Sequence, residues 1–237
     1  VQGTPWSKVI TEKPLHENLE ILLKVADAVG FGHARGVIHR DLKPENVMLG
    51  EYGEVLVMDW GLAIATPAFR KSATITQTTS MGGTPAYMAP EMAAGPVEKV
   101  GPSSDVYLLG AILFEILTGQ PPHSGKTVMK CLMAAARNEI VATQHSGELM
   151  DIALRAMASK MTDRPQTVRD FQNEIREYQS HSESLALLQR AEERLQAARV
   201  SKDYEELSRA VFEYDEAVEL WTGNERAKHG GLAARLA

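Results

Sequence analysis

The chain has 237 residues, of which 44% are hydrophobic, so it is long enough for one large or two modest domains with a real core. A formal net charge of −6, without a basic stripe and interleaved aromatic residues, argues against a nucleic-acid-binding protein. The single cysteine, Cys131, excludes an intramolecular disulfide and has no metal-ligand spacing with the seven histidines. A lone cysteine and the lack of a bilayer-spanning apolar run favour a cytoplasmic location.

The first predicted elements are a short helix over residues 4–10 and a long helix from Asn18 to Arg35. Leu19, Leu22, Leu23, Ala26 and Val29 recur at helical spacing. They give the long helix one apolar face, which is typical of a helix packed on a core.

Short strands follow the long helix. Residues 37–38 are a β-branched pair, and residues 47–49 and 54–58 are predicted to pair as a hairpin across the turn at 50–53. This hairpin would return Asp59 beside Asn46. One carboxylate and one amide oxygen would then converge on a single spot, as Mg²⁺ prefers together with phosphate oxygens and water.

A central helix is predicted next, starting at Ser103-Ser104-Asp105, whose short polar side chains can cap free N–H groups. Residues 106–117 are apolar nearly all round, interrupted by Gly110 and Glu115, and the run ends at residues 118–122. Such a helix is buried or lies in a membrane, and this one is too short to span a bilayer. We therefore expect a buried central helix, followed by smaller helices over residues 127–137, 148–159 and 167–178.

The character of the chain changes after Tyr178. Residues 179–184 are predicted to form a polar linker, followed by helices over residues 185–200 and 203–221 and a third from residue 225. The pattern of small and aromatic residues resembles that of a tetratricopeptide repeat, and the residues concerned are Ala198, Ala210, Tyr214 and Ala217. A plain helical hairpin is the alternative. Because one repeat cannot bury its own apolar face, we expect the segment to be truncated.

Three motifs occur in order. Residues 39–46 read His-Arg-Asp-Leu-Lys-Pro-Glu-Asn, residues 59–61 read Asp-Trp-Gly, and residues 83–91 read Gly-Thr-Pro-Ala-Tyr-Met-Ala-Pro-Glu. Together they resemble the catalytic-loop, metal-binding and substrate-loop motifs of eukaryotic-like Ser/Thr protein kinases. The resemblance covers the C-terminal lobe of that family, over about residues 2–178.

The resemblance implies catalytic roles for Asp41, Lys43 and Thr84. Asp41 would accept or orient the substrate hydroxyl proton, and Lys43 would stabilise negative charge on the transferred phosphate. Thr84 would bridge toward both residues and shape the substrate site. Lys43, two residues after Asp41, is the Ser/Thr-kinase form of this loop.

The resemblance also implies ATP and magnesium as cofactors. Asn46 and Asp59 would hold the magnesium ions, Lys43 would lie near the phosphates, and Met48 would lie under the adenine. Trp60 replaces the commoner Phe of the family, and we expect it to pack beneath the loop as a tolerated variant.

Other motif positions are expected to be structural. His39 would be a packed residue rather than a base. Glu91 and Arg164 would form an ion pair, and Asp105 would hold the backbone of the catalytic loop. Breaking a buried pair of this kind leaves an uncompensated charge.

Regulation is implied by Arg40, which in this family often receives a phosphate from the activation loop. Residues 66–80 offer Ser72, Thr74, Thr76, Thr78, Thr79 and Ser80. We favour Thr78 and Thr79 as sites, and expect Thr84 to remain unmodified. The alternative is that the Ser/Thr content has no regulatory meaning.

No glycine-rich phosphate loop, strand Lys or partner Glu precedes the catalytic loop in this chain. Residues 1–3 resemble the exit from the hinge between lobes, so the N-terminal lobe is expected to be missing. The isolated chain would then be inactive, because ATP lacks its cover.

We therefore expect a mainly α-helical kinase C-lobe with a small β-hairpin at residues 1–178, and a helical, repeat-like segment at residues 179–237. The full-length parent would phosphorylate Ser and Thr of protein substrates using Mg²⁺ and ATP, and the C-terminal helices could bind a protein partner. The alternative is an inactive fragment or pseudokinase that serves as a helical interaction module. Retention of Asp41, Lys43, Asn46 and Asp59 argues against the pseudokinase.

Overall fold

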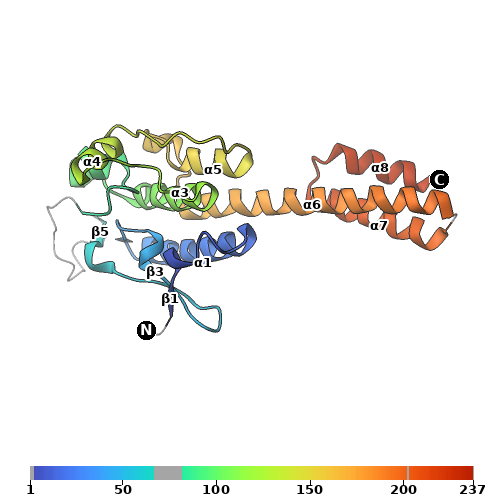
Figure 1. The fold of residues 1–237 in the computed structure, drawn as a ribbon, viewed down its shortest axis with the longest axis horizontal. Helices are drawn as coiled ribbons and strands as arrows, with labels where there is room; N and C mark the ends of the chain where they lie inside the picture. Colours follow the sequence, from blue (N-terminus) through green and yellow to red (C-terminus); the bar gives the residue numbers. More distant parts are fainter. Residues whose placement is uncertain (1–2, 67–81, 202, 237) are drawn as a thin grey trace. The chain divides into compact units, whose positions relative to one another are not determined.

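A computed structural model describes residues 3–66, 82–201 and 203–236 (Figure 1). The expected phosphorylation sites, Thr78 and Thr79 foremost among them, lie outside the described residues. The chain divides into two compact units, Val1–Glu174 and Ile175–Ala237, and the division falls within one helix. None of the described helices is long and apolar enough to cross a membrane.

The first unit is mainly helical, as expected, with two small sheets. Its helices are α1 (Leu15–Ala34), α2 (Pro90–Ala94), α3 (Pro102–Thr118), α4 (Val128–Ala136) and α5 (Glu148–Ala156), followed by the start of α6 (Val168–Ser201). Its strands are β1 (Thr4–Pro5), β2 (Val37–Ile38), β3 (Val47–Leu49), β4 (Val55–Val57) and β5 (Ile64–Ala65). Short 3₁₀ turns cover Trp6–Lys8, Pro44–Asn46, Trp60–Leu62, Val97–Lys99 and Met161–Asp163.

Both sheets are antiparallel and frame the catalytic motifs. One has the strand order β1-β3-β4, with Val47 opposite Val57, and the other pairs β2 with β5. The predicted hairpin is confirmed, and its turn uses Gly53 at a φ of 84°, where glycine meets no steric penalty. The hairpin leaves residues 58–59 next to the end of the catalytic loop.

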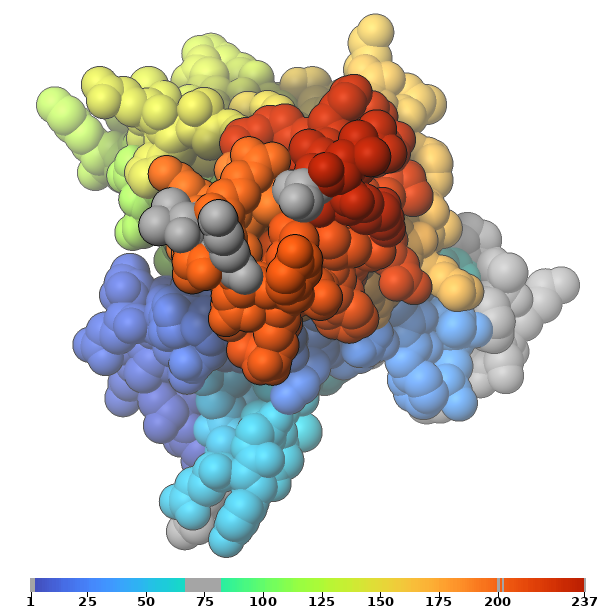
Figure 2. All heavy atoms as spheres, turned by 90° about the vertical axis from the view of Figure 1, so that its right-hand side faces the viewer, coloured from blue at the N-terminus to red at the C-terminus, as the bar shows by residue number. Residues whose placement is uncertain are grey.

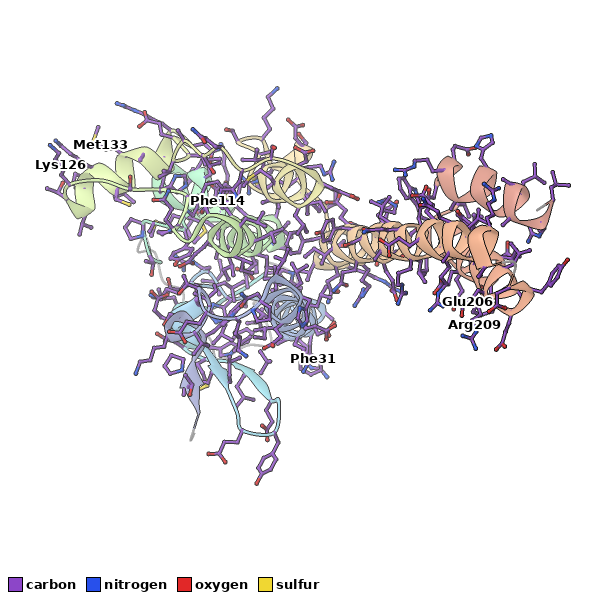
Figure 3. All side chains as sticks on the ribbon, turned by 45° about the vertical axis from the view of Figure 1, so that its right-hand side comes forward. Phe31, Phe114, Lys126, Met133, Glu206 and Arg209 are labelled. Carbon is purple, nitrogen blue, oxygen red and sulfur yellow. The ribbon has the colours of Figure 1, made fainter. Side chains whose placement is uncertain are left out.

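The core of the first unit is built around α3, as the apolar run predicts. Residues 106–114 are all buried, and α3 packs against α1 and α5. Figure 3 labels Phe114 on α3, within the mass of side chains of this unit. Gly110 allows the closest approach, since a Cβ atom there would lie 2.6 Å from the Cβ of Ala156. The glycine is therefore required by packing rather than by a turn.

Replacing Gly110 with Val is expected to lower the free energy of unfolding by about 1–3 kcal/mol, because a well-packed helix contact must separate to admit the new atoms. Urea unfolding followed by circular dichroism would measure the loss. Gly101→Val is the matched control, since a Cβ at Gly101 meets no atom within 4 Å. An equal loss in both variants would contradict the packing role of Gly110.

Two predicted helix starts were misplaced. α1 begins at Leu15, three residues before Asn18. α3 begins at Pro102 with Gly101 as its N-cap, and Ser104 Oγ accepts a hydrogen bond of 3.2 Å from the Gly101 N–H. Proline suits this first helical position because its missing N–H would have no partner there in any case.

The predicted linker at residues 179–184 is wrong, because α6 is continuous through it. The segment contains no glycine or proline to end a helix. Its serines are used in packing: Ser180 Oγ donates to the carbonyl of Leu220 (3.1 Å), and the buried Ser184 Oγ donates to that of Ala217 (2.6 Å). The serine side chains of this segment therefore bond to the helix that ends at Leu220, instead of facing solvent as they would in a loop.

The second unit combines the rest of α6 with α7 (Tyr204–Leu220) and α8 (Glu225–Arg235). Asp203 and Asn224 are the N-caps of α7 and α8, accepting from Glu205 N (2.9 Å) and Ala227 N (3.1 Å). The core comprises Leu187, Leu188, Ala191, Leu195, Ala210, Tyr214, Ala217, Ala227 and Ala234. The surface carries ion pairs, among them Glu206 with Arg209 on α7, labelled in Figure 3.

Candidate active site

The catalytic loop is anchored to the start of α3. The backbone N–H groups of His39 and Arg40 donate to the two carboxylate oxygens of Asp105, both at 2.9 Å. Asp105 is fully buried, and its Oδ2 also lies 2.7 Å from Nε2 of His33. Arg40 adopts a φ of 73°, a strained value for a residue other than glycine, which these charge-assisted bonds stabilise. The expected role of Asp105 is confirmed.

Three of the predicted site residues meet in one cluster. The Thr84 hydroxyl donates to Asp41 Oδ1 (2.8 Å), and Lys43 Nζ donates to Thr84 Oγ1 (2.5 Å) and lies 3.2 Å from Asp41 Oδ2. Asp41 is only 6% exposed. Its carboxylate is therefore fixed in orientation by groups from two separate segments.

Asn46 completes this arrangement. Its amide nitrogen donates to the Asp41 carbonyl (2.8 Å) and to Asp41 Oδ2 (3.1 Å). Both partners are acceptors, so the amide nitrogen must face Asp41 and the amide oxygen must face away from it. The Asn46 amide nitrogen can thus orient Asp41 while the Asn46 amide oxygen coordinates a ligand on the other side.

The hairpin brings Asp59 to the same end as Asn46. The Met58 N–H donates to the Asn46 carbonyl at 2.7 Å, and Asp59 follows with a φ of 59°. The exposed Asp59 carboxylate accepts from the Gly61 N–H at 3.4 Å. No group of three or more His, Cys, Asp or Glu that could hold a metal ion occurs among the described residues. Mg²⁺ needs only one or two protein ligands beside phosphates and water, so an amide and a carboxylate oxygen fit it.

Trp60 contacts the catalytic loop through His39, although 38% of its surface is exposed. Its ring meets His39 edge-on with centroids 4.6 Å apart, and its Nε1 donates to the Val57 carbonyl at 3.0 Å. His39 is fully buried, as a structural role requires. The partner that sequence reasoning missed is Gly32 on α1, where a Cβ would come within 3.3 Å of the Trp60 ring. A glycine inside an apolar helix was the available signal.

The substrate segment at residues 83–91 ends in the predicted ion pair. Arg164 donates to both oxygens of Glu91, at 2.7 and 2.9 Å, and Ser104 Oγ adds a third bond to Glu91 at 2.8 Å. Both charged residues are buried. Burial acts to raise the pKa of Glu91, but the Arg164 guanidinium outweighs it and holds that pKa below its usual value. The pair ties this segment to the loop before α6.

Glu115 joins the same segment, although its sequence position indicated only an interruption in an apolar helix. The Tyr87 hydroxyl donates to Glu115 Oε2 at 2.7 Å. Burial raises the pKa of both groups. The Glu115 carboxylate raises the pKa of Tyr87 further, whereas the hydrogen bond from Tyr87 offsets part of the rise in the pKa of Glu115. Cys131, by contrast, is half-buried and has a pKa raised by burial, in agreement with a packing role.

His123 was not identified from the sequence either. Its backbone N–H donates to the Ala86 carbonyl in the substrate segment (3.1 Å), and its Nδ1 lies 2.9 Å from the Glu139 carbonyl. Its Nε2 lies 2.8 Å from the hydroxyl of Tyr107, which donates to Asn138 Oδ1 at 2.6 Å. Burial lowers the pKa of His123, although the backbone carbonyls of Glu139 and Met88 oppose this.

His123 is expected to make stability pH-dependent. Its folded-state pKa lies below the ordinary value of about 6.5, so its contribution is present above about pH 6.5 and is lost as pH falls toward the folded-state pKa. His123→Phe should remove this part of the pH dependence, at most about 1.4 kcal/mol per pH unit. Urea unfolding at a series of pH values would measure it. Parallel pH profiles for the two proteins would contradict the assignment.

Comparison with known proteins agrees with this geometry. A family model described as "Protein kinase domain" matches residues 5–216, past the end of the first unit. The chain is similar to the serine/threonine-protein kinase PknB of Mycobacterium leprae (35% identity over 68% of this chain and 26% of that protein). It is also similar to PrkC of Bacillus subtilis (31% identity over 97% of this chain and 36% of that protein).

The chain thus spans about a quarter to a third of the length of these relatives. The family match nevertheless covers most of the 237 residues, and the catalytic-loop residues sit in one hydrogen-bonded cluster. The chain belongs to the protein kinase family.

Proposed function

We propose that this chain carries the catalytic C-terminal lobe of a kinase that transfers the γ-phosphoryl group of ATP to Ser or Thr hydroxyls of protein substrates. The observation that carries the proposal is the cluster in which Thr84, Lys43 and Asn46 all bond to Asp41. Phosphoryl transfer depends mostly on positioning and charge neutralisation, and a fixed carboxylate beside an ammonium group supplies both.

Each residue has a separate task in this proposal. Asp41 orients the acceptor hydroxyl and takes its proton, and Thr84 holds Asp41 from the substrate side. Lys43 stabilises negative charge on the transferred group. Lys43 also touches Thr84, so the charge-stabilising and substrate-shaping groups are coupled.

The cofactors proposed are ATP and Mg²⁺. Asn46 and Asp59 would hold the metal, which neutralises phosphate charge when bound, and Met48 would lie under the adenine. Met48 is half-buried in β3, opposite Pro5 and Leu56. We further propose a cytoplasmic location, supported by the single free cysteine.

The cover of the nucleotide is proposed to come from a small lobe outside this sequence, since residues 1–38 contain no glycine-rich loop. The 237-residue chain alone is then expected to show no steady phosphoryl transfer, because the γ-phosphate is not held in line and water is not excluded. Calorimetric titration with Mg·ATP and a peptide assay would test this. Micromolar binding with turnover would contradict it.

The second unit is proposed to be a docking or spacer element of tetratricopeptide-like packing. Ala198, Ala210, Tyr214 and Ala217 are buried there, at the positions that the repeat pattern assigns to packing residues. The alternative of a non-catalytic interaction module rests on the same unit. Deleting residues 185–237 from the parent kinase should leave peptide phosphorylation largely intact.

Activation by phosphorylation is also proposed. Thr78 or Thr79 would carry the phosphate, and the Arg40 guanidinium would bind it. Arg40 is buried beside the catalytic Asp41, and a Cβ at Gly82 would lie 3.3 Å from its Nη2. The residues that follow 67–81 thus lie against the guanidinium. Mass spectrometry of the active kinase should find phosphate on this segment and none on Thr84.

The test of the proposed activity uses the full-length kinase with matched peptides that differ only in a Ser, Thr or Tyr acceptor. Phosphate incorporation is expected with Ser and Thr, and it should stop when magnesium is chelated. Equal transfer to Tyr, or none to any of the three in the presence of Mg·ATP, would overturn the proposal.

A further inference from the structure

A groove of about 590 Å³ lies in the first unit between the N-terminal half of α1 and the sheet formed by β1, β3 and β4. Figure 2 shows the loop of the β3–β4 hairpin, in cyan, standing out from the body of this unit. None of Asp41, Lys43, Asn46, Asp59 and Thr84 lines the groove. It is therefore separate from the candidate active site.

The floor of the groove is apolar. Val9, Ile21, Leu49 and Val55 line it, from three different segments of the chain. On the sheet side the groove is closed by the protein itself: a Cβ at Gly3 would lie 2.7 Å from the Leu49 carbonyl oxygen, and the Gly50 N–H already donates to the Glu54 carbonyl at 2.9 Å. An apolar floor beside charged side chains suits an extended peptide, because alternate side chains of such a peptide can face the floor while the others reach the rim.

The rim carries an excess of negative charge. Both lysines are engaged: Lys13 pairs with Glu17 at 2.7 Å, and Lys24 donates to the Gly53 carbonyl at 3.1 Å. Glu20, Glu51 and Glu54 also line the groove, and all three are exposed. Six charged side chains thus contribute four carboxylates and two ammonium groups, which leaves a net charge of −2 on the rim. Lys13 is paired with a carboxylate, whereas the Lys24 ammonium bonds only a neutral carbonyl.

We propose that this groove binds an extended segment of a protein substrate in which Lys or Arg side chains alternate with apolar ones. The apolar side chains meet the floor and the cations meet Glu20, Glu51 and Glu54. The inference rests on the proposed kinase function, because it makes the bound protein a substrate. Binding at a second site raises the effective concentration of the acceptor near Asp41 without altering the chemistry there.

The first test measures binding alone, with the full-length protein. The probe is a fluorescein-labelled peptide of alternating Arg and Leu, without Ser, Thr or Tyr, and the comparison peptide has Glu in place of Arg. Fluorescence anisotropy should detect binding of the Arg peptide only, weakening as salt screens the charges. Equal affinity for both peptides, or no binding of the Arg peptide, would overturn the proposal.

Charge reversal locates the site. Glu20→Lys with Glu51→Lys should weaken binding of the Arg peptide about tenfold at low salt, because two attractions become repulsions. The matched control is Glu98→Lys with Glu219→Lys, which changes the net charge equally at exposed residues that do not line the groove. Equal weakening in both double variants would show a general charge effect and overturn the site.

The second test separates docking from catalysis. A Ser peptide extended by the Arg-Leu segment should have a lower KM than the Ser peptide alone, with kcat unchanged. In the Glu20→Lys, Glu51→Lys protein the two KM values should converge. If no peptide is phosphorylated although the Arg peptide binds, the proposed activity is wrong and the groove remains a binding site. If both Ser peptides have the same KM in the unaltered protein, the groove is not a substrate-docking site and the proposed activity is unaffected.

Discussion

Asp41→Asn in the full-length kinase is expected to lower the rate of phosphoryl transfer by about 10²–10⁴-fold while the fold persists. Asn keeps the size of Asp but accepts no proton. The contacts also become mismatched, since Asp41 Oδ2 lies beside Lys43 Nζ (3.2 Å) and the Asn46 amide nitrogen (3.1 Å), both donors. An amide nitrogen there would face two donors, and turned the other way it would face the Thr84 hydroxyl, which now donates to Asp41.

Radiolabelled phosphate incorporation with a Ser peptide would measure this effect, and thermal unfolding would confirm the fold. Asp59→Ala is the informative comparison, because it should weaken binding of Mg·ATP rather than remove proton transfer. Glu219→Gln, at an exposed position on α7 far in sequence from the motifs, should leave the rate unchanged. A rate within a few-fold of the unaltered protein for Asp41→Asn would show that this carboxylate is not the catalytic group.

Arg164→Ala is expected to lower the free energy of unfolding by about 3–5 kcal/mol, because it leaves the Glu91 carboxylate buried without its cation. Arg164 also donates to the carbonyls of Ala158 (2.7 Å) and Ser103 (3.1 Å), so three segments lose a shared partner. Arg164→Lys keeps the positive charge but cannot form the bidentate hydrogen bond to Glu91, so it should recover only part of the stability.

Chemical denaturation would measure this loss, with Arg155→Ala as the matched control. Arg155 pairs with Glu174 at 3.2 Å, but half of its side chain is exposed, so its removal should change stability by less than about 1 kcal/mol. The Arg164 assignment would fail if the two variants lost the same stability. Because the pair holds the substrate segment, the KM for a peptide should rise in any Arg164 variant that remains folded.

The parts of the fold that were predictable carry strong local signals. The β3–β4 hairpin follows from two short apolar runs around a glycine turn, and α3 follows from an apolar run interrupted only by Gly110 and Glu115. The cluster of Asp41, Lys43 and Thr84 was inferred from resemblance, because nothing local brings residues 41 and 84 together. The hydrogen bond between Thr84 and Asp41 joins residues that are 43 positions apart in the sequence, so it forms only when the chain is folded.

The errors have an equally physical origin. Residues 179–184 look like a linker because three of the six are serine, which is a weaker helix former than the flanking residues and whose hydroxyl competes for backbone hydrogen bonds. In the folded chain two of these serines donate to the carbonyls of Leu220 and Ala217, and these bonds support the helical conformation. Both acceptors lie far along the chain, so the local sequence does not reveal them. His123 and Glu115 were missed for the same reason, since each is a single polar residue whose partners come from other elements.

The anchoring of the catalytic loop by Asp105 has a consequence for the order of folding. The amides of His39 and Arg40 reach Asp105 across 66 and 65 residues, so this loop closes only after α3 has docked beside it. We expect these two amides to be among the slowest in the chain to exchange hydrogen for deuterium, opening together with α3 rather than by local fraying. Catalytic geometry would then appear in refolding only when α3 docks, and it would disappear in a single step with the core.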